Sequence, residues 1–467
     1  MMGMASMAPM KVAIVAASQR GTGGQSVQAQ LLVRGWHHDP AVRVRFIAID
    51  PELPAALRWV ERIPWLRTLV RMPFYLRGLW RGTRDADIVH IFSASYWSFL
   101  LATVPAWLIA RLLGKRTLIN YHSGEARDHL KRSPIAVRVL GAADRLVVPT
   151  EYLVNVFREF DLRAEAVPNI VDSEQFCYRP RRPLRPRLIC TRGFHRYYSV
   201  DVVVRAFGLI KKEFPEARLC LVGKGPMQRE IEDLVKQLQL VDVEFVGPIP
   251  HKDTGRYYDQ SDIFINASWV DNMPVSILEA FASGTPVVTT APEGILYVVE
   301  HERTGLLCEP GDWAALGENV TRLLREPDLA LCLAQNAHDE SHRYRWEAVR
   351  TPWLEVYGAM HTPGLQDGDS SRLPSTRMTP TGANEREKRV EGLKNRLIAT
   401  VRRSVGGRRE CWGIPALNSG RNLIERFLLH LVAWKKFRLL GTAILALAIR
   451  WRRPWMREGW RGRAERA

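Results

Sequence analysis

Short apolar segments alternate with helix-length segments through most of the chain, and this alternation strongly limits its fold. One series of apolar segments precedes a proline- and arginine-rich joint at Arg179–Arg187, and a second series follows it. Such alternation predicts an α/β fold with two doubly wound parallel sheets, each covered by helices on both faces. A ligand cleft is then expected where the strand ends of the two domains face each other. The expected strands are Val12–Ala17, Val44–Ile49, Ile88–Phe92, Thr117–Tyr121, Leu146–Val148, Leu188–Cys190, Leu219–Val222, Val243–Val246, Ile263–Asn266 and Val287–Thr290.

The segment Asp271–Val288 gives the clearest indication of a ligand. Seven residues separate Asp271 from Glu279, a helix is expected to begin between them, and a Gly-Thr-Pro turn then leads into a strand. Free N–H groups and the positive dipole end make a helix N-terminus a site for phosphate. The two oxygens of Glu279, about two turns further along, suit a pair of adjacent hydroxyls. The segment therefore fits a nucleotide-sugar, and the alternative is a carboxylate pair on a solvated helix face.

The run ILEAFASGTPVV inside this segment resembles the E-x7-E segment of retaining glycosyltransferases of family 4, which have the GT-B fold. The resemblance covers roughly residues 10–360 and implies that Glu279 holds the nucleotide ribose. Asp271 stands where the family has its first Glu, so the resemblance gives it a hydroxyl of the sugar, with a side chain one methylene shorter. The domains expected are an acceptor-side domain at 1–180, a nucleotide-sugar domain at 181–345 and a helix at 346–360 that returns to the first domain.

Two motifs of the first domain fit the same family. The glycine-rich loop Arg20–Gln25 follows the first expected strand, and the resemblance implies that Gly23 and Gly24 face the donor phosphate and the acceptor. Glycine-rich turns are common between strand and helix, so the loop alone is weak evidence. His122 follows the fourth strand, where the family has a histidine at the sugar. A purely structural hydrogen-bonding histidine is the alternative.

In the second domain, the resemblance implies that Arg192 grips the diphosphate, as a guanidinium can hold two phosphate oxygens at once. The family's following Lys is missing, with Tyr198 near its place, and His195 or Arg196 is the expected substitute. The loop Val222–Pro226 matches the family's G-x-G-P loop and corroborates the resemblance. The remaining donor contacts that the resemblance implies are the turn at Ile249 beside the nucleobase and the helix start at Met273, Val275 and Ser276.

The reaction implied is transfer of a sugar with retention of its anomeric configuration. No Ser-His-Asp set, metal-ligand cluster or Walker loop is apparent in the sequence, so neither hydrolysis nor phosphoryl transfer is indicated. No metal and no cofactor besides the donor is expected, because basic side chains and a helix end can stabilise the leaving diphosphate.

The net charge of +18 and the pI near 9.9 imply an acidic partner. Leu57–Trp80 is rich in Arg and Trp, and so is a C-terminal extension at 391–467, which follows an expected flexible linker at 361–390. The apolar run Leu439–Ile449 is too short to span a bilayer, so we expect helices on an anionic membrane surface. A helical hairpin docked on the body is the alternative.

Compartment and acceptor follow from these observations. Scattered cysteines without a C-x-x-C pair indicate reduced thiols, and Met1–Met10 does not read as a signal peptide. We therefore expect a cytoplasmic enzyme, peripheral at the inner face of the membrane, that acts on a lipid-linked or glycan acceptor in envelope or exopolysaccharide synthesis. A degenerate GT-B scaffold protein is the second hypothesis. A nucleic-acid-binding protein is the third, disfavoured because no recognised binding module is present.

Overall fold

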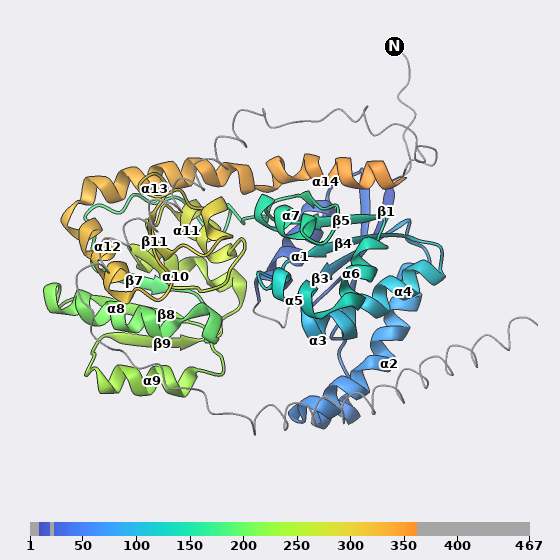
Figure 1. The fold of residues 1–467 in the computed structure, drawn as a ribbon, viewed down its shortest axis with the longest axis horizontal. Helices are drawn as coiled ribbons and strands as arrows, with labels where there is room; N and C mark the ends of the chain where they lie inside the picture. Colours follow the sequence, from blue (N-terminus) through green and yellow to red (C-terminus); the bar gives the residue numbers. More distant parts are fainter. Residues whose placement is uncertain (1–8, 19–22, 362–467) are drawn as a thin grey trace, which may run out of the picture. The chain divides into compact units, whose positions relative to one another are not determined.

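The computed structural model describes residues 9–18 and 23–361, and these contain two α/β domains (Figure 1). Each domain has a six-stranded sheet in which every recorded strand pair is parallel. The expected α/β class with two doubly wound sheets is confirmed. The linker expected at 361–390, apart from His361, and the extension expected at 391–467 lie outside the described residues.

The first sheet has the strand order β2-β1-β3-β4-β5-β6, so the order reverses between β1 and β3. Its strands are β1 (Met10–Ala16), β2 (Val42–Ala48), β3 (Ile88–Ser93), β4 (Arg116–Tyr121), β5 (Arg145–Val148) and β6 (Glu165–Ala166). The helical segments are α1 (Gly24–His37), η1 (Ala55–Arg62), α2 (Pro64–Thr83), α3 (Tyr96–Ser98), η2 (Phe99–Thr103), α4 (Val104–Leu112), α5 (Ala126–Arg132), α6 (Pro134–Gly141) and α7 (Glu151–Arg158).

The second sheet has the order β12-β11-β10-β7-β8-β9 and reverses between β7 and β10. Its strands are β7 (Arg187–Cys190), β8 (Arg218–Val222), β9 (Val243–Gly247), β10 (Ile263–Asn266), β11 (Val287–Thr290) and β12 (Leu306–Cys308). The helical segments are η3 (Arg196–Tyr198), α8 (Val200–Glu213), α9 (Gln228–Gln237), η4 (His251–Asp253), α10 (Gly255–Gln260), α11 (Val275–Ser283), η5 (Ile295–Tyr297), α12 (Trp313–Arg325), α13 (Pro327–Ser341), η6 (His342–Tyr344) and α14 (Trp346–His361).

Each sheet has a hydrophobic core on both faces, because successive strand residues point to opposite sides. In β1, Ala13 and Val15 belong to one core, whereas Val12 and Ile14 belong to another. In β7, Leu188 and Cys190 pack on one side and Ile189 on the other. Parallel strands buried on both faces explain why the sequence shows continuous apolar runs instead of alternation.

The last described helix, α14, belongs in sequence to the second half but packs on the core of the first domain. Trp353 and Tyr357 are buried in the same cluster as Ile14 of β1 and Trp36 of α1. The hydroxyl of Tyr357 lies 2.8 Å from Nδ1 of His90 in β3. Both domains are therefore joined by a helix as well as by the connection between β6 and β7.

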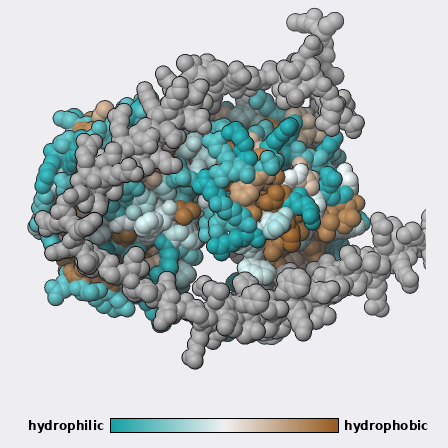
Figure 2. Space-filling model, viewed as in Figure 1, coloured by the Kyte–Doolittle hydropathy of each residue, from teal (hydrophilic) through white to brown (hydrophobic). Residues whose placement is uncertain are grey.

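On the face shown in Figure 2, most of the coloured residues are hydrophilic, and hydrophobic residues gather on the part of the first domain that carries α4 and α6. Exposed residues there include Leu108, Leu112 and Ile135. Within the described ranges, no helix is both long enough and apolar enough to cross a membrane.

Candidate active site

A cavity of about 850 Å³ is lined by residues of both domains. Its walls include Gly23 and Ser95, which follow β1 and β3, and Arg192 and Asp271, which follow β7 and β10. In each sheet, the strand order reverses between the two strands that these residues follow: β1 and β3 in the first sheet, and β7 and β10 in the second. Because the loops on either side of such a point diverge, a crevice opens there at the carboxyl ends of the strands. The topology therefore places the cavity where an α/β sheet binds ligands.

Two helix N-termini, one from each domain, meet in this cavity. Helix α1 begins after Gly23 and α11 begins after Pro274; neither helix has a side-chain cap or an acidic residue in its first turn. A Cβ atom on Gly24 would lie 3.4 Å from Cγ2 of Val275, so the two helix starts are in close contact. Uncapped first-turn N–H groups and the positive dipole ends of both helices make this point suitable for an anion.

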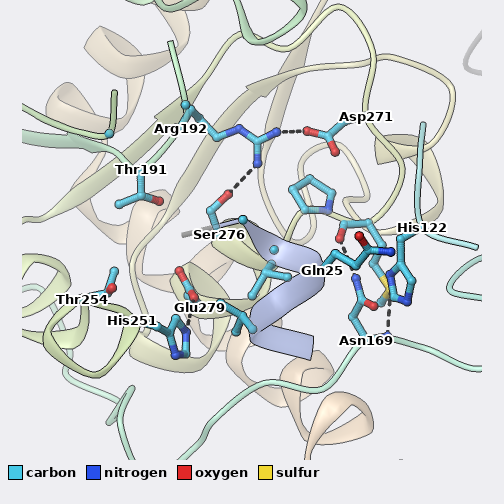
Figure 3. Close-up of a pocket in the computed structure, with 18 of the residues that line it drawn as sticks. Gln25, His122, Asn169, Thr191, Arg192, His251, Thr254, Asp271, Ser276 and Glu279 are labelled. Atoms are coloured by element: carbon cyan, nitrogen blue, oxygen red, sulfur yellow. Dashed lines mark hydrogen bonds and ion pairs between the residues drawn. The ribbon is translucent and has the colours of Figure 1, made fainter. Parts of the chain in front are cut away.

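Arg192 is the buried cation beside the start of α11 (Figure 3). Its guanidinium forms an ion pair with Asp271, donates to Oγ of Ser276 at 3.2 Å, and lies 3.8 Å above the centre of the Tyr198 ring. Burial alone would lower the pKa of Arg192, but the charge of Asp271 together with Tyr198, Cys190 and Tyr258 raises it. A charged guanidinium is thus held rigidly at the anion-binding end of the cavity.

Asp271 is fully engaged by neighbouring donors. One carboxylate oxygen pairs with Arg192 and accepts from Oγ of Ser268 at 3.2 Å, and the other accepts from the backbone N–H of Asn272 at 3.0 Å. In this arrangement Asp271 orients Arg192. A role at the sugar, as the resemblance implies, remains a prediction for a carboxylate that already has these partners.

Glu279 lies at another part of the cavity, separate from Asp271 (Figure 3). Its oxygens lie 2.9 Å from Nε2 of His251 and 3.0 Å from the hydroxyl of Tyr258. Burial opposes the charge on His251, yet its pKa is raised because Glu279 accepts its hydrogen bond. Burial and then the charge of Glu279 raise the pKa of Tyr258 well above its usual value. The carboxylate is therefore fixed in position by groups on η4 and α10.

His122 lines the cavity from the first domain, at the end of β4. Burial lowers its pKa to about 3, so the imidazole is neutral near pH 7. Its Nε2 atom is buried and has no hydrogen-bond partner among the described residues, and the same holds for Nε2 of Gln25. Nearby, Nδ2 of Asn169 donates to the backbone oxygen of Met273 at 2.9 Å and ties the two domains together. His122 can thus hold a hydroxyl but is a poor proton acceptor.

Most of the residues predicted from sequence line this cavity. They are Gly23, Gly24, His122, Arg192, Ile249, Asp271, Met273, Val275, Ser276 and Glu279. The two proposed substitutes for the missing Lys do not: neither His195 nor Arg196 is among the lining residues. The ring of His195 stacks on Tyr197, and the largely exposed Arg196 lies 3.5 Å from Glu230. His195 therefore packs behind the lining residue Tyr197, whereas Arg196 is directed to a contact outside the cavity.

Lys224 is one of three lining cations that sequence reasoning did not single out, the others being Arg34 and Lys252. It belongs to the glycine loop after β8, and it is exposed without an ion pair to any acidic residue that the structure describes. Gly223 has a φ of +152°, and a Cβ atom there would lie 2.1 Å from the backbone oxygen of Arg192. The backbone N–H of Phe194 also donates to the oxygen of Lys224 at 3.2 Å. Close backbone packing therefore holds Lys224 beside the Arg192 loop.

The first-domain wall also carries Ser95, Ser123 and Glu125, none of which was predicted. The two serine hydroxyls lie 3.0 Å apart, and burial raises the pKa of Glu125. No sequence pattern marks these residues; only the fold brings them together. Within the described ranges, no group of three or more His, Cys, Asp or Glu side chains is arranged to hold a metal ion.

Two family models match the chain and together span more than half of it. The model described as Glycosyltransferase Family 4 matches residues 22–175, and the one described as Glycosyl transferases group 1 matches residues 181–340. The first match covers the domain with the glycine-rich loop, and the second covers the domain with Arg192 and Glu279.

Curated relatives show a similar but more distant likeness. An exopolysaccharide phosphotransferase of Streptomyces coelicolor is 27% identical over 282 residues, which are 59% of this chain and 29% of that protein. The N-acetyl-alpha-D-glucosaminyl L-malate synthase of Bacillus anthracis is 29% identical over 296 residues, 58% of this chain and 74% of that protein. The chain thus spans less than a third of the first relative's length and about three quarters of the second's.

Among solved structures, the Anabaena protein HepE in complex with UDP and glucose has a TM-score of 0.59 with 16% identity. The match covers 75% of this chain and all of HepE, and it shows a common fold. The chain therefore belongs to the glycosyltransferases of GT-B fold, with a family 4 domain followed by a group 1 domain.

Proposed function

We propose that this protein transfers a sugar from a nucleotide-diphosphate-sugar to a hydroxyl of a lipid-linked or glycan acceptor, with retention of the anomeric configuration. The observation that carries the proposal is the meeting of two uncapped helix N-termini, α1 and α11, beside the buried Arg192. A point where two positive helix ends and a guanidinium meet suits a diphosphate. Glu279 accepts the ribose hydroxyls at the nucleoside end.

The reaction is then a substitution at the anomeric carbon. The bond from this carbon to the diphosphate oxygen breaks, a bond to the acceptor oxygen forms on the same face, and the acceptor proton passes to the leaving phosphate. Arg192, Lys224 and the helix ends stabilise the charge that grows on the diphosphate, which preorganised groups do without reorganisation. We propose that these groups suffice without a metal ion and without a further cofactor.

The first-domain wall of the cavity receives the acceptor and the sugar. Neutral His122 holds a sugar hydroxyl and shields the positive charge developing at the anomeric carbon, since its low pKa keeps it from taking a proton. Ser95, Ser123 and Glu125 add hydroxyl and carboxylate groups that suit a polyhydroxy acceptor. Envelope or exopolysaccharide synthesis is the setting that we propose, at the inner face of an anionic membrane.

A catalytically degenerate GT-B binding protein is the second candidate. The observation that favours it is that Arg192 and Asp271 already engage each other and their neighbours, together with Tyr198 near the expected Lys position. A scaffold protein would bind nucleotide-sugars without converting them, so turnover separates the two candidates.

The test begins with purified full-length protein and a set of nucleotide-sugars that differ in base and sugar. We expect one of them to raise the melting temperature and to be consumed with an acceptor glycan, giving a product whose anomeric configuration, measured by NMR, matches that of the donor. Glu279→Ala is expected to weaken donor binding by about 1.5–3 kcal/mol, because charged hydrogen bonds to the ribose are lost. Glu318→Ala, an exposed residue of α12, is the control. Binding without turnover supports the scaffold, and inversion rules out the retaining reaction.

A further inference from the structure

One surface of the first domain combines exposed tryptophans with unpaired arginines. We call it the Trp–Arg surface and define it as the exposed side chains of η1 and α2: Arg58, Trp59, Arg62, Trp65, Leu69, Arg77, Trp80 and Arg81. In Figure 1, α2 lies at the lower edge of the first domain, below α4. None of these residues lines the cavity.

The apolar part of the surface is far more exposed than is usual for such side chains. Trp65 is 70% exposed, Trp59 is 59% exposed and Leu69 is 48% exposed. The C-terminal half of α2 is anchored instead, because Tyr75 and Leu79 are buried and the Tyr75 hydroxyl donates to the backbone oxygen of Ala102 at 2.7 Å. The helix is therefore fixed at one end and presents large apolar side chains to solvent at the other, which marks an interaction site.

The charge of this surface is strongly positive. Residues 55–84 contain seven arginines and no lysine, and Glu61 is the single acidic residue in this stretch. Glu61 pairs with Arg71 at 2.7 Å, and Arg84 lies over the ring of Trp80 at 5.3 Å. The other arginines of the stretch have no ion pair with an acidic residue in the part of the chain that the structure describes. Among the described residues, nothing neutralises the charges of these arginines.

We propose that the Trp–Arg surface docks onto an anionic lipid surface, with Trp59 and Trp65 in the headgroup layer and the arginines on lipid phosphates. The inference deepens the proposed membrane-surface action by naming the residues responsible. Tryptophan has an apolar body and a polar N–H, so it is favoured at the boundary between headgroups and acyl chains. Arginine is attracted to the negative potential of anionic lipids. This mode leaves the cavity open to an acceptor, since the docked residues do not line it.

The experiment uses the full chain and vesicles of phosphatidylcholine with or without phosphatidylglycerol. Trp59→Ala/Trp65→Ala is expected to weaken sedimentation with the anionic vesicles at least about tenfold, because two interfacial anchors are lost. Trp313→Ala, an equally apolar exposed residue of α12, is the matched control and should bind within about twofold of wild type. Arg58→Gln/Arg62→Gln should weaken binding to the anionic vesicles as the tryptophan variant does. The difference in vesicle binding between this arginine variant and the wild type should become smaller as the salt concentration rises.

Hydrogen exchange locates the contact directly. In the wild type, we expect anionic vesicles to slow hydrogen exchange in the peptides that cover residues 55–84, even if other parts of the chain also bind the vesicles. Each variant must keep the wild-type melting temperature and turnover of a soluble acceptor. Unchanged vesicle binding by the tryptophan variant, or no protection of residues 55–84, overturns the assignment of this surface. If the full chain does not bind anionic vesicles but does bind an acidic protein, the lipid proposal is overturned. If the wild type shows no turnover of any nucleotide-sugar, the proposed transferase activity is refuted, but the lipid proposal is not affected.

Discussion

At the scale of single residues, Arg192 and Asp271 act as one unit. The ion pair, the hydroxyls of Ser268 and Ser276, and the ring of Tyr198 leave the guanidinium a single arrangement. Such preorganisation is what makes a fixed charge effective against a charge that develops during reaction. It also means that one cation of the usual diphosphate pair is firmly held, while the second has to come from another element.

Lys224→Ala tests whether this second cation is Lys224. We expect turnover to fall about tenfold to a hundredfold with a smaller change in donor affinity, because the charge on the leaving diphosphate grows only as the bond breaks. Steady-state kinetics and calorimetry measure the two effects separately. Lys236→Ala, an exposed lysine of α9, is the matched control. Equal turnover in both variants would leave Arg192 as the main cationic side chain at the diphosphate.

At the scale of elements, the contact between α1 and α11 decides what fits at the diphosphate. Gly24→Val is expected to weaken nucleotide-diphosphate binding about tenfold or more, because added methyl groups meet Val275 and fill the space in front of both helix ends. Isothermal calorimetry measures the loss. Gly78→Val, at a helical glycine with open space around it, controls for the lower helix propensity of valine. Similar affinity in both variants would place the phosphates elsewhere.

The attachment of α14 to the first domain rests partly on a buried hydrogen bond between Tyr357 and His90. Tyr357→Phe should lower the free energy of unfolding by about 1–3 kcal/mol, because a buried ring nitrogen loses its partner. Denaturant unfolding gives the value. Tyr178→Phe removes a hydroxyl that donates to Gln335 at an exposed site, so its effect should be clearly smaller. Equal effects would mean that the buried bond adds little to the docking of α14.

At the scale of the whole molecule, buried histidines make stability depend on pH. Burial lowers the pKa of His129 to about 4 and that of His90 well below 6.5. Below pH 6.5 the unfolded chain therefore binds protons that the folded chain does not, and the free energy of unfolding falls as pH decreases. The slope is about 1.4 kcal/mol per pH unit for each such histidine. His251, whose pKa is raised, acts in the opposite direction.

His129→Gln is the variant that isolates one contribution. Between pH 6.5 and about 4 the slope of stability against pH should become shallower by about 1.4 kcal/mol per unit, since the replaced side chain does not titrate. Denaturant unfolding across this range measures it. His37→Gln, at an exposed position of α1, is the matched control. An unchanged slope for His129→Gln would show that this histidine has the same pKa in the folded and unfolded states.

The sequence by itself determined the class of fold, and most of the site residues predicted from it line the cavity. Apolar runs separated by helix-length segments identify strands buried on both faces, because burial of a parallel sheet requires continuous apolar residues. The segment from Asp271 to Glu279 carries its own start signal, a proline followed by a helix, so its place at the cavity was predictable. Strands β6 and β12 were missed because they have only two and three residues, too few for a pattern.

Only the tertiary structure decided which cations reach the cavity and how each carboxylate is used. His195 and Arg196 follow Arg192 closely in sequence, yet neither lines the cavity, whereas Lys224 reaches it from the loop after the next strand. Likewise, Asp271 and Glu279 look alike in sequence but receive different partners: Arg192 for one, and His251 and Tyr258 for the other. The physical reason is that strand and helix formation depend on local patterns, whereas the direction of a side chain depends on contacts between segments distant in the chain.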